Sequence, residues 1–261
     1  MHIVSQTLCI APSVDDLKLR YTMHMKKLPA LYISNTLSGA KEEFIPLSPG
    51  AVTMYHCGPT VYDTAHIGNF RTFILNDIIR RTFEFAGYSV DQVMNITDVD
   101  DKTIRRSQAE KVPLLELTRM YEKLFLDDLA SLNILTPKRL LRATDHIEEM
   151  QNMIGNLIEH GKAYISNDGI YYSIGMDPHY GELAGIKMQQ IAHTHNDDNA
   201  EHSRIAHDEY EKENPKDFAL WKFATPDDGE AVWDAPFGKG RPGWHIECSA
   251  MATTALGPTI D

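Results

Sequence analysis

Two cysteines and a histidine–asparagine pair are the residues of this sequence best suited to chemistry. Cys57 and Cys248 lie far apart in the chain, and apart from Cys9 they are its only cysteines. His66 and Asn69 stand where a helix is expected to begin, and helix starts attract phosphates through free amides and the helix dipole. There the imidazole and the amide could donate to phosphate oxygens as negative charge builds up in a transition state.

Each of these residues also has an ordinary structural interpretation. Two distant thiols are usually small buried apolar side chains, and a His-x-Gly-Asn string before a helix is usually an N-terminal turn. A second metal site is not expected in the acidic stretch that follows residue 189, because its histidines are irregularly spaced and fit solvated loop positions. These histidines are His193, His195, His202 and His207.

The elements around these residues predict a strand, a turn, a helix and a second strand. Residues 51–57 are a short run of strand formers that a Gly-Pro pair ends, and residues 70–86 have apolar side chains at helical spacing. Those side chains are Phe70, Phe73, Ile74 and Ile78. Residues 90–96 predict the second strand. Because this order favours a parallel pair, the sequence predicts the first half of a Rossmann-like α/β fold.

Two helices are expected after the second strand, the second of them at residues 114–132, and a third is expected further along the chain. Residues 114–132 have one predicted apolar face, which carries Leu117, Met120, Leu124 and Leu132. Another helix should begin near Asp145, because Asp145 and Glu148 have capping-box spacing. Its apolar stripe is Ile147, Met150, Ile154 and Ile158.

The pattern then changes, which predicts an insertion. Residues 163–166 and 170–174 flank Asn-Asp-Gly, a strong hairpin signal that does not belong to alternating helices and strands. The expected segments are an N-terminal extension (1–29), the first half of the catalytic domain (30–143), the insertion (144–216) and the start of the second half (217–261). A helix near 246–255 and a strand at 259–261 would leave an open sheet edge, so we expect the domain to be incomplete at Asp261.

Composition narrows the class of protein. The formal net charge of −12 argues against a strong grip on RNA by this chain, because RNA-binding surfaces cluster Lys and Arg. Most residues of the small basic groups near Arg80, Lys102 and Lys138 are expected to lie on solvated helix faces. No run approaches the roughly 20 apolar residues of a membrane span. Three widely spaced cysteines do not suggest a disulfide scaffold, so we expect a cytoplasmic protein that does not bind membranes.

Four motifs, in order, resemble those of cysteinyl-tRNA synthetases, a class I family. They are residues 57–69 (CGPTVYDTAHIGN), 95–102 (NITDVDDK), 218–222 (FALWK) and 238–249 (GKGRPGWHIECS). The resemblance runs from about residue 30 to the end. It implies a Rossmann-like catalytic domain with a parallel sheet, interrupted by an α+β insertion. The implied reaction is ATP-dependent activation of L-cysteine, with Mg²⁺, followed by ligation of the cysteine to tRNA(Cys).

The resemblance also implies a zinc site. Cys57 and Cys248 correspond to two of the family's four zinc ligands, and zinc would bind the thiol of substrate cysteine much better than the hydroxyl of serine. The other two ligands come from a His-His-Glu-Asn-Glu motif that this sequence does not contain. The family's Lys-Met-Ser-Lys-Ser loop and anticodon-reading helical domain are also absent. We therefore expect the chain as given to be an inactive fragment.

Other positions are assigned to substrates by the same resemblance. His66, Gly68 and Asn69 correspond to the ATP-binding motif, with His66 and Asn69 catalytic. The amino acid would be contacted by Gly58, Thr97 and Trp244, although each also has an ordinary packing explanation.

Two alternatives to the synthetase remain open. One is the related ligase that joins cysteine to an amino-sugar in mycothiol synthesis. The other is a truncated, non-catalytic paralogue.

Overall fold

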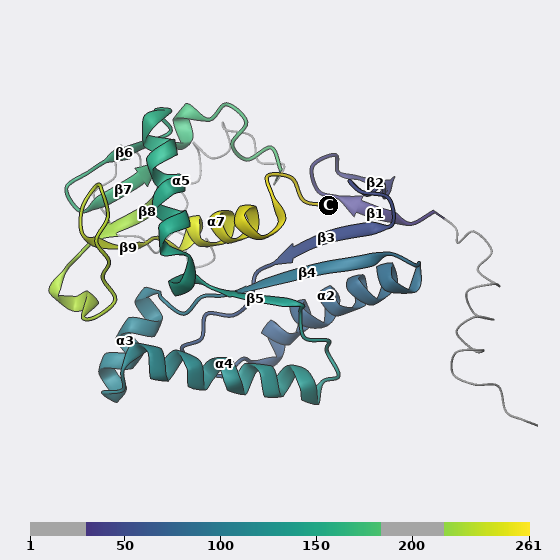
Figure 1. Cartoon of the computed structure of the whole chain (residues 1–261), viewed down its shortest axis with the longest axis horizontal. Helices are drawn as coiled ribbons and strands as arrows, with labels where there is room; N and C mark the ends of the chain where they lie inside the picture. Colours follow the sequence, from purple (N-terminus) through teal and green to yellow (C-terminus); the bar gives the residue numbers. More distant parts are fainter. Residues whose placement is uncertain (1–29, 184–216) are drawn as a thin grey trace, which may run out of the picture.

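A parallel sheet forms the centre of the fold, as the sequence predicts. The computed structural model describes residues 30–183 and 217–261 (Figure 1). Strand β3 (Ala51–His56) pairs in parallel with β4 (Ser89–Ile96), and α2 (Ile67–Phe85) connects them. A third strand, β5 (Arg139–Arg142), pairs in parallel with β4 and gives the order β3-β4-β5. The expected extension at 1–29 and the histidines from His193 to His207 lie outside the described residues.

The two faces of β4 have different neighbours. Met94 and Ile96 pack into one core with the aromatic side chains of α2 and of α4 (Leu114–Ser131). Alternate residues of a strand point to opposite faces, and Thr97, directly after β4, bonds to α7 (Trp244–Leu256). Figure 1 shows α2 and α4 on one side of the parallel sheet and α7 on the other. The sheet therefore lies between two helical layers, and α7 crosses the side on which Thr97 lies.

Helices α3 (Asp101–Glu110) and α4 follow β4, but α4 does not bury the predicted face. Leu117 is buried, whereas the other three residues of the predicted face, Met120, Leu124 and Leu132, are exposed. The buried residues are Leu114, Leu117, Thr118, Tyr121, Glu122, Phe125 and Leu129. The ring of Phe125 lies 4.8 Å from that of Phe73 on α2. Helix α4 thus turns its two large aromatic side chains inward, because they bury more apolar area than the methionine and leucines do.

Helix α2 differs from its prediction in the same way. Phe70 and Phe73 are buried, but Ile74 and Ile78 are exposed, and Asp77 and Arg80 are buried in their place. Arg80 donates to Gln92 on β4 at 3.0 Å, and Asp77 accepts from the backbone of Leu135 at 3.0 Å. These partners compensate the burial of two charged side chains.

The basic groups are not all solvated helix faces. Arg80 is buried, and Arg139 and Arg142 lie on the strand β5. Arg142 donates to both carboxylate oxygens of Glu122, at 2.8 and 2.6 Å. These three arginines are exceptions to the solvated helix faces expected for most of the basic residues, and each has a hydrogen-bond acceptor in the fold.

The predicted hairpin forms and belongs to a second sheet. Strands β6 (Ala163–Ile165) and β7 (Gly169–Tyr172) pair antiparallel around Asn-Asp. Strands β8 (Phe218–Phe223) and β9 (Gly240–Pro242) complete the order β6-β7-β8-β9. This sheet takes strands from both sides of the expected boundary at 216/217, and the division into domains stays a prediction.

Helix α5 (Ile147–Glu159) has the predicted apolar stripe but not the predicted cap. Ile147, Met150 and Ile154 are buried. A short 3-10 turn, η1 (Ala143–His146), occupies the expected capping position, and the helix begins after His146 without a side-chain cap. Asp145 instead lies 3.8 Å from Arg142, so its carboxylate is used in an ion pair.

The hairpin β1 (Tyr32–Asn35) and β2 (Ala40–Glu43) precedes the parallel sheet. Residues 259–261 do not form the predicted strand. Instead, the Asp261 carboxylate accepts from the backbone amides of Leu47 and Thr53, at 2.6 and 2.9 Å. Across the described part of the chain, no helix has the length and apolar character needed to span a membrane.

The buried face of α4 can be tested with two leucines of the same helix. Leu117 is fully buried, whereas Leu115 is 58% exposed. Leu117→Ala should lower the free energy of unfolding by about 2–5 kcal/mol because it leaves a cavity. Leu115→Ala should change it by less than about 0.5 kcal/mol. Urea unfolding measures both, and equal losses would show that the face is assigned wrongly.

Candidate active site

The residues singled out from the sequence gather where the parallel strands end. Cys57 and Gly58 follow β3, Thr97 follows β4, and His66 begins α2. In open parallel sheets, ligands bind beyond the carboxyl ends of the strands. The topology therefore places the candidate residues at the edge of the sheet where a substrate is expected.

Cys57 and Cys248 are brought into contact by α7. Their sulfur atoms lie 3.3 Å apart, a hydrogen-bonding distance for thiols and too long for a disulfide. The hydrogen bond from Cys248 lowers the pKa of Cys57 to about 7, although burial acts in the opposite direction. The same hydrogen bond, together with burial, raises the pKa of Cys248. Cys57 is therefore the more acidic thiol of the pair.

A chain of buried hydrogen bonds connects the segments that carry the two thiols. The backbone N–H of Gly58 donates to Asn95 Oδ1 at 3.1 Å, and Asn95 Nδ2 donates to Thr97 Oγ1 at 3.3 Å. The Thr97 hydroxyl then donates to Glu247 Oε2 at 3.0 Å. Asn95, Thr97 and Glu247 are only 1%, 2% and 1% exposed. The loop after β3, the end of β4 and helix α7 are thus held together by polar side chains inside the protein.

Position 58 tolerates only glycine in this arrangement. A Cβ atom there would lie 1.8 Å from the backbone oxygen of Asn95. No flexible side chain could move to relieve this clash, because the contact is with backbone. The close approach of β3 and β4 at their ends therefore depends on Gly58.

One polar atom beside the thiol pair, the buried Glu247 Oε1, has no hydrogen-bond partner among the described residues. The buried Tyr55 hydroxyl lies next to the Cys248 thiol and interacts with it. Burial raises the pKa of Glu247 well above its ordinary value, although the bond from Thr97 opposes this. Burial and then the neighbouring Cys248 thiol raise the pKa of Tyr55. Unsatisfied buried atoms are rare in folded proteins, so the presence of Glu247 Oε1 marks this place as unusual.

His66 and Asn69 cap α2. His66 Nδ1 accepts from the backbone N–H of Gly68 at 3.0 Å, and Asn69 Oδ1 accepts from the backbone N–H of His66 at 3.0 Å. This is a capping box built with histidine and asparagine. In a neutral imidazole whose Nδ1 accepts, the proton lies on Nε2. The exposed His66 ring therefore keeps its Nε2–H as a free donor, while Nδ1 accepts in the cap.

Trp244 is the first residue of α7 and is 56% exposed. Its ring lies 5.3 Å from that of His245. Trp244 and Cys248 are four residues apart on one helix, so their side chains lie on the same face. A large exposed aromatic side chain on the face of a thiol leaves apolar surface available for a ligand.

The resemblance implies a zinc ion, which binds four ligands in a tetrahedral arrangement. Two thiolates bound to one tetrahedral zinc at about 2.3 Å would be about 3.8 Å apart, and the sulfurs of Cys57 and Cys248 lie 3.3 Å apart. The two sulfurs would fit two corners of such a site if they moved slightly further apart. Within residues 30–183 and 217–261, no group of three or more His, Cys, Asp or Glu side chains is placed to hold a metal ion. The described residues thus fit half of a zinc site.

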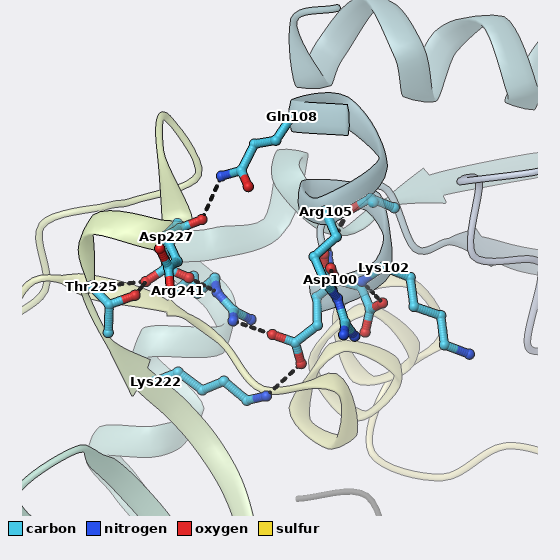
Figure 2. Close-up of polar contacts among 11 residues, drawn as sticks. Asp100, Lys102, Arg105, Gln108, Lys222, Thr225, Asp227 and Arg241 are labelled. Carbon is cyan, nitrogen blue, oxygen red and sulfur yellow. Dashed lines mark hydrogen bonds and ion pairs between the residues drawn. The ribbon is translucent and has the colours of Figure 1, made fainter. Parts of the chain in front are cut away.

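An ion-pair network holds the second sheet to the start of α3. Asp101 accepts from Lys222 on β8 at 2.8 Å and also from Arg241 on β9. Arg241 in turn donates to Asp228 at 2.6 Å. Figure 2 shows Lys222 and Arg241 extending from their strands toward α3. The side chains of Arg241 and Asp228 are 8% and 6% exposed, which makes this pair a buried one.

The network fixes the charge of both carboxylates. Burial alone would raise the pKa of Asp101 and of Asp228, but the neighbouring Arg241 and the other donors outweigh burial and hold both pKa values below the ordinary value. Gln108 of α3 also donates to the backbone oxygen of Asp227 at 2.6 Å, as Figure 2 shows. The contact between the second sheet and α3 is therefore charged and paired, and the Arg241–Asp228 pair is its buried part.

Several residues of this site were not predicted from the sequence. Asn95, Glu247 and Tyr55 all lie inside or beside the motifs, yet they were not assigned any role. A signal existed for Glu247, because it is a carboxylate among the mostly apolar residues 246–252. The ion-pair network gave no local signal, because Asp101, Lys222, Asp228 and Arg241 come from four separate segments.

A family model described as the tRNA synthetases class I (C) catalytic domain matches residues 43–261. A cysteine–tRNA ligase of Brachyspira hyodysenteriae is 48% identical over 227 residues, which are 87% of this chain and 47% of that protein. A cysteine–tRNA ligase of Chlamydia pneumoniae is 47% identical over 241 residues, which are 92% of this chain and 49% of that protein.

The chain thus spans about half the length of the curated relatives it matches. Among solved structures, methionyl-tRNA synthetase of Mycobacterium tuberculosis with methionyl-adenylate is 23% identical, with a TM-score of 0.42. That alignment covers 48% of this chain and 25% of the other.

The buried ion pair can be tested with two adjacent aspartates. Asp228→Asn should lower the free energy of unfolding by about 3 kcal/mol, because it removes one partner of a buried pair while Arg241 keeps Asp101. Asp227→Asn should change it by less than about 0.5 kcal/mol, because the Asp227 side chain is exposed. Chemical denaturation compares the two variants. A harmless Asp228→Asn would mean that this pair does not hold the junction together.

Proposed function

The chain belongs to the family of class I tRNA synthetase (C) catalytic domains, and from this we propose the function of the complete protein. It activates L-cysteine with ATP to form cysteinyl-adenylate and pyrophosphate, and then transfers cysteine to tRNA(Cys). The observation that carries the proposal is the contact between the Cys57 and Cys248 sulfurs at the carboxyl ends of β3 and β4. The relatives named above are cysteine–tRNA ligases, which agrees with a site that selects by thiol chemistry.

The first step needs positioning and charge stabilisation more than covalent chemistry. The carboxylate of cysteine attacks the α-phosphorus of ATP in line, and pyrophosphate leaves with the electrons of the broken bond. The Nε2–H of His66 and the amide of Asn69 would donate to phosphate oxygens, with ATP bound as its Mg²⁺ complex. Gly68 lies in the first turn of α2, where backbone amides are available to an anion.

The amino acid would lie beside the thiol pair. Zinc held by Cys57 and Cys248, with two ligands from outside the described residues, would supply a Lewis acid that prefers the thiol of cysteine to the hydroxyl of serine. Gly58 and Thr97 line the strand ends next to this position, and Trp244 lies on the same face of α7 as Cys248. Discrimination by a thiol-selective metal would make a separate editing site unnecessary.

The location and the RNA partner follow from the same chemistry. Zinc binding requires reduced thiols, which the cytoplasm maintains. The net charge of −12 gives this chain little attraction for RNA phosphates. We therefore assign most of the grip on tRNA(Cys) to parts of the complete protein other than this chain.

The role of the thiols predicts a loss of activity when one is removed. In the complete protein, Cys57→Ala should abolish cysteine-dependent exchange of pyrophosphate into ATP, because one zinc ligand is lost. Cys9→Ala, which removes the third cysteine of this sequence, should leave the exchange rate unchanged. Exchange unaffected by Cys57→Ala would refute the zinc role. Charging of an amino-sugar in place of tRNA would assign the protein to the mycothiol-type ligases.

The two interpretations of His66 can be separated by substitution. Asn is as good an N-cap residue as any, so His66→Asn should keep the stability of α2, whereas His66→Ala should cost about 0.5–2 kcal/mol. Both should lose exchange activity by about 10²–10³-fold, the effect of removing one transition-state donor. Thermal unfolding and the exchange assay are measured on the same samples. Full activity in His66→Asn would leave the cap as the only role of this residue.

A further inference from the structure

The polar chain through Asn95, Thr97 and Glu247 begins beside one thiol and ends beside the other. Gly58, whose N–H begins the chain, directly follows Cys57, and Glu247 directly precedes Cys248. From this we propose that Glu247, acting through Thr97 and Asn95, is a positioning residue that holds the two sulfurs at the separation needed to share one metal ion. The inference rests on the proposed function, because it explains how the metal site of that function is built.

The first argument is that this series of hydrogen bonds is continuous and buried. Its three side-chain links, of 3.1, 3.3 and 3.0 Å, run without a gap from the loop after β3 to α7. A junction that needed only to be stable could be filled with apolar side chains at equal or lower cost. Polar side chains that are connected to one another instead specify one arrangement of the segments that they join.

The second argument comes from the metal's requirements. Zinc ligands need support from the residues around them, because outer partners orient the ligands, and losing such a partner weakens metal binding. Two metal-bound thiolates carry like charges that repel each other, so their segments need to be tied together. The bond between Thr97 and Glu247 ties β4 to α7 one residue away from Cys248.

The third argument is the close contact of the strands. Because Gly58 has no Cβ, the loop after β3 can approach the backbone of Asn95. Asn95 then accepts from that loop through Oδ1 and donates to Thr97 through Nδ2, so one side chain fixes both neighbours. An apolar residue at position 95 could do neither. The Cys57 side of the pair is therefore set by backbone contact and the Cys248 side by Glu247.

The test is made in the complete protein and removes the hydrogen bond between Thr97 and Glu247, once by changing the donor and once by changing the acceptor. Thr97→Val and Glu247→Met each remove the bond between these residues with little change of volume. Thr97→Ser and Glu247→Gln keep a hydroxyl donor and an acceptor. Thr118→Val is the matched control, because Thr118 is equally buried and its hydroxyl bonds to Leu115 in α4.

Two measurements report on the thiols without the enzymatic reaction. Zn²⁺ affinity is measured by competition with a chromophoric chelator. Binding of phenylarsine oxide to the metal-free protein reports whether two thiols are close enough to share one arsenic atom, and Cys57→Ala provides its blank. Circular dichroism and thermal unfolding confirm that each variant is folded.

Thr97→Val and Glu247→Met should each weaken Zn²⁺ binding by about 10- to 100-fold, and the double variant should be no weaker than either single one. The serine and glutamine variants should stay within about twofold of wild type. Wild-type affinity in Thr97→Val, or an equal loss in Thr118→Val, would overturn the proposal. If Glu247→Met does not fold, the nearly isosteric Thr97→Val decides alone.

These readouts separate the inference from the proposed function. Neither measurement uses ATP, cysteine or tRNA. A protein without cysteine-dependent exchange whose Zn²⁺ affinity still depends on Thr97 and Glu247 would refute the function and keep the inference. Normal exchange together with a Zn²⁺ affinity that does not depend on Thr97 or Glu247 would support the proposed function and refute the inference.

Discussion

The placement of α7 across the carboxyl ends of β3 and β4 is the constraint on which the site depends. Cys248 and Trp244 are useful only if this helix lies over the loop that carries Cys57. The hydrogen bond from Thr97 to Glu247 fixes α7 over β4, and the missing side chain of Gly58 lets the β3 loop approach β4. A thiol pair separated by most of the chain is thus created by a few contacts at one edge of a sheet.

The same constraint explains why four separate sequence motifs belong together. The first and fourth meet at the sulfurs of Cys57 and Cys248. The second meets the fourth twice, through Thr97 with Glu247 and through Asp101 with Arg241. The third meets the second where Lys222 pairs with Asp101. Buried ion pairs cost desolvation energy but penalise any arrangement in which a charge loses its partner, so these contacts define how the antiparallel sheet lies against the parallel one.

Much of this fold could be predicted from local patterns, and most of the errors have a common cause. Strands β3 and β4 and helix α2 were predictable because apolar periodicity and a Gly-Pro turn mark them locally. The buried face of α4 could not be predicted in this way, because leucine, methionine, tyrosine and phenylalanine occur on several sides of the helix. Only the aromatic rings of α2 decide which side of α4 is buried. The place of Arg139 on a strand could not be predicted for a similar reason. Its ion-pair partner Asp91 lies far away in the sequence, so no local pattern marks the pair. Glu247 stands out as a carboxylate among mostly apolar residues, but its role follows only from the fold, which places it against Thr97.

His66 shows that a structural role and a chemical role need not compete. From the sequence, an N-terminal turn and a phosphate-binding histidine were alternatives. In the structure, the cap uses Nδ1 as an acceptor from Gly68, and this bond fixes the tautomer with its proton on Nε2. A histidine without the cap could place its proton on either nitrogen and turn freely. The turn therefore prepares the ring as a donor, so the contact that begins the helix also orients the group that would meet a phosphate.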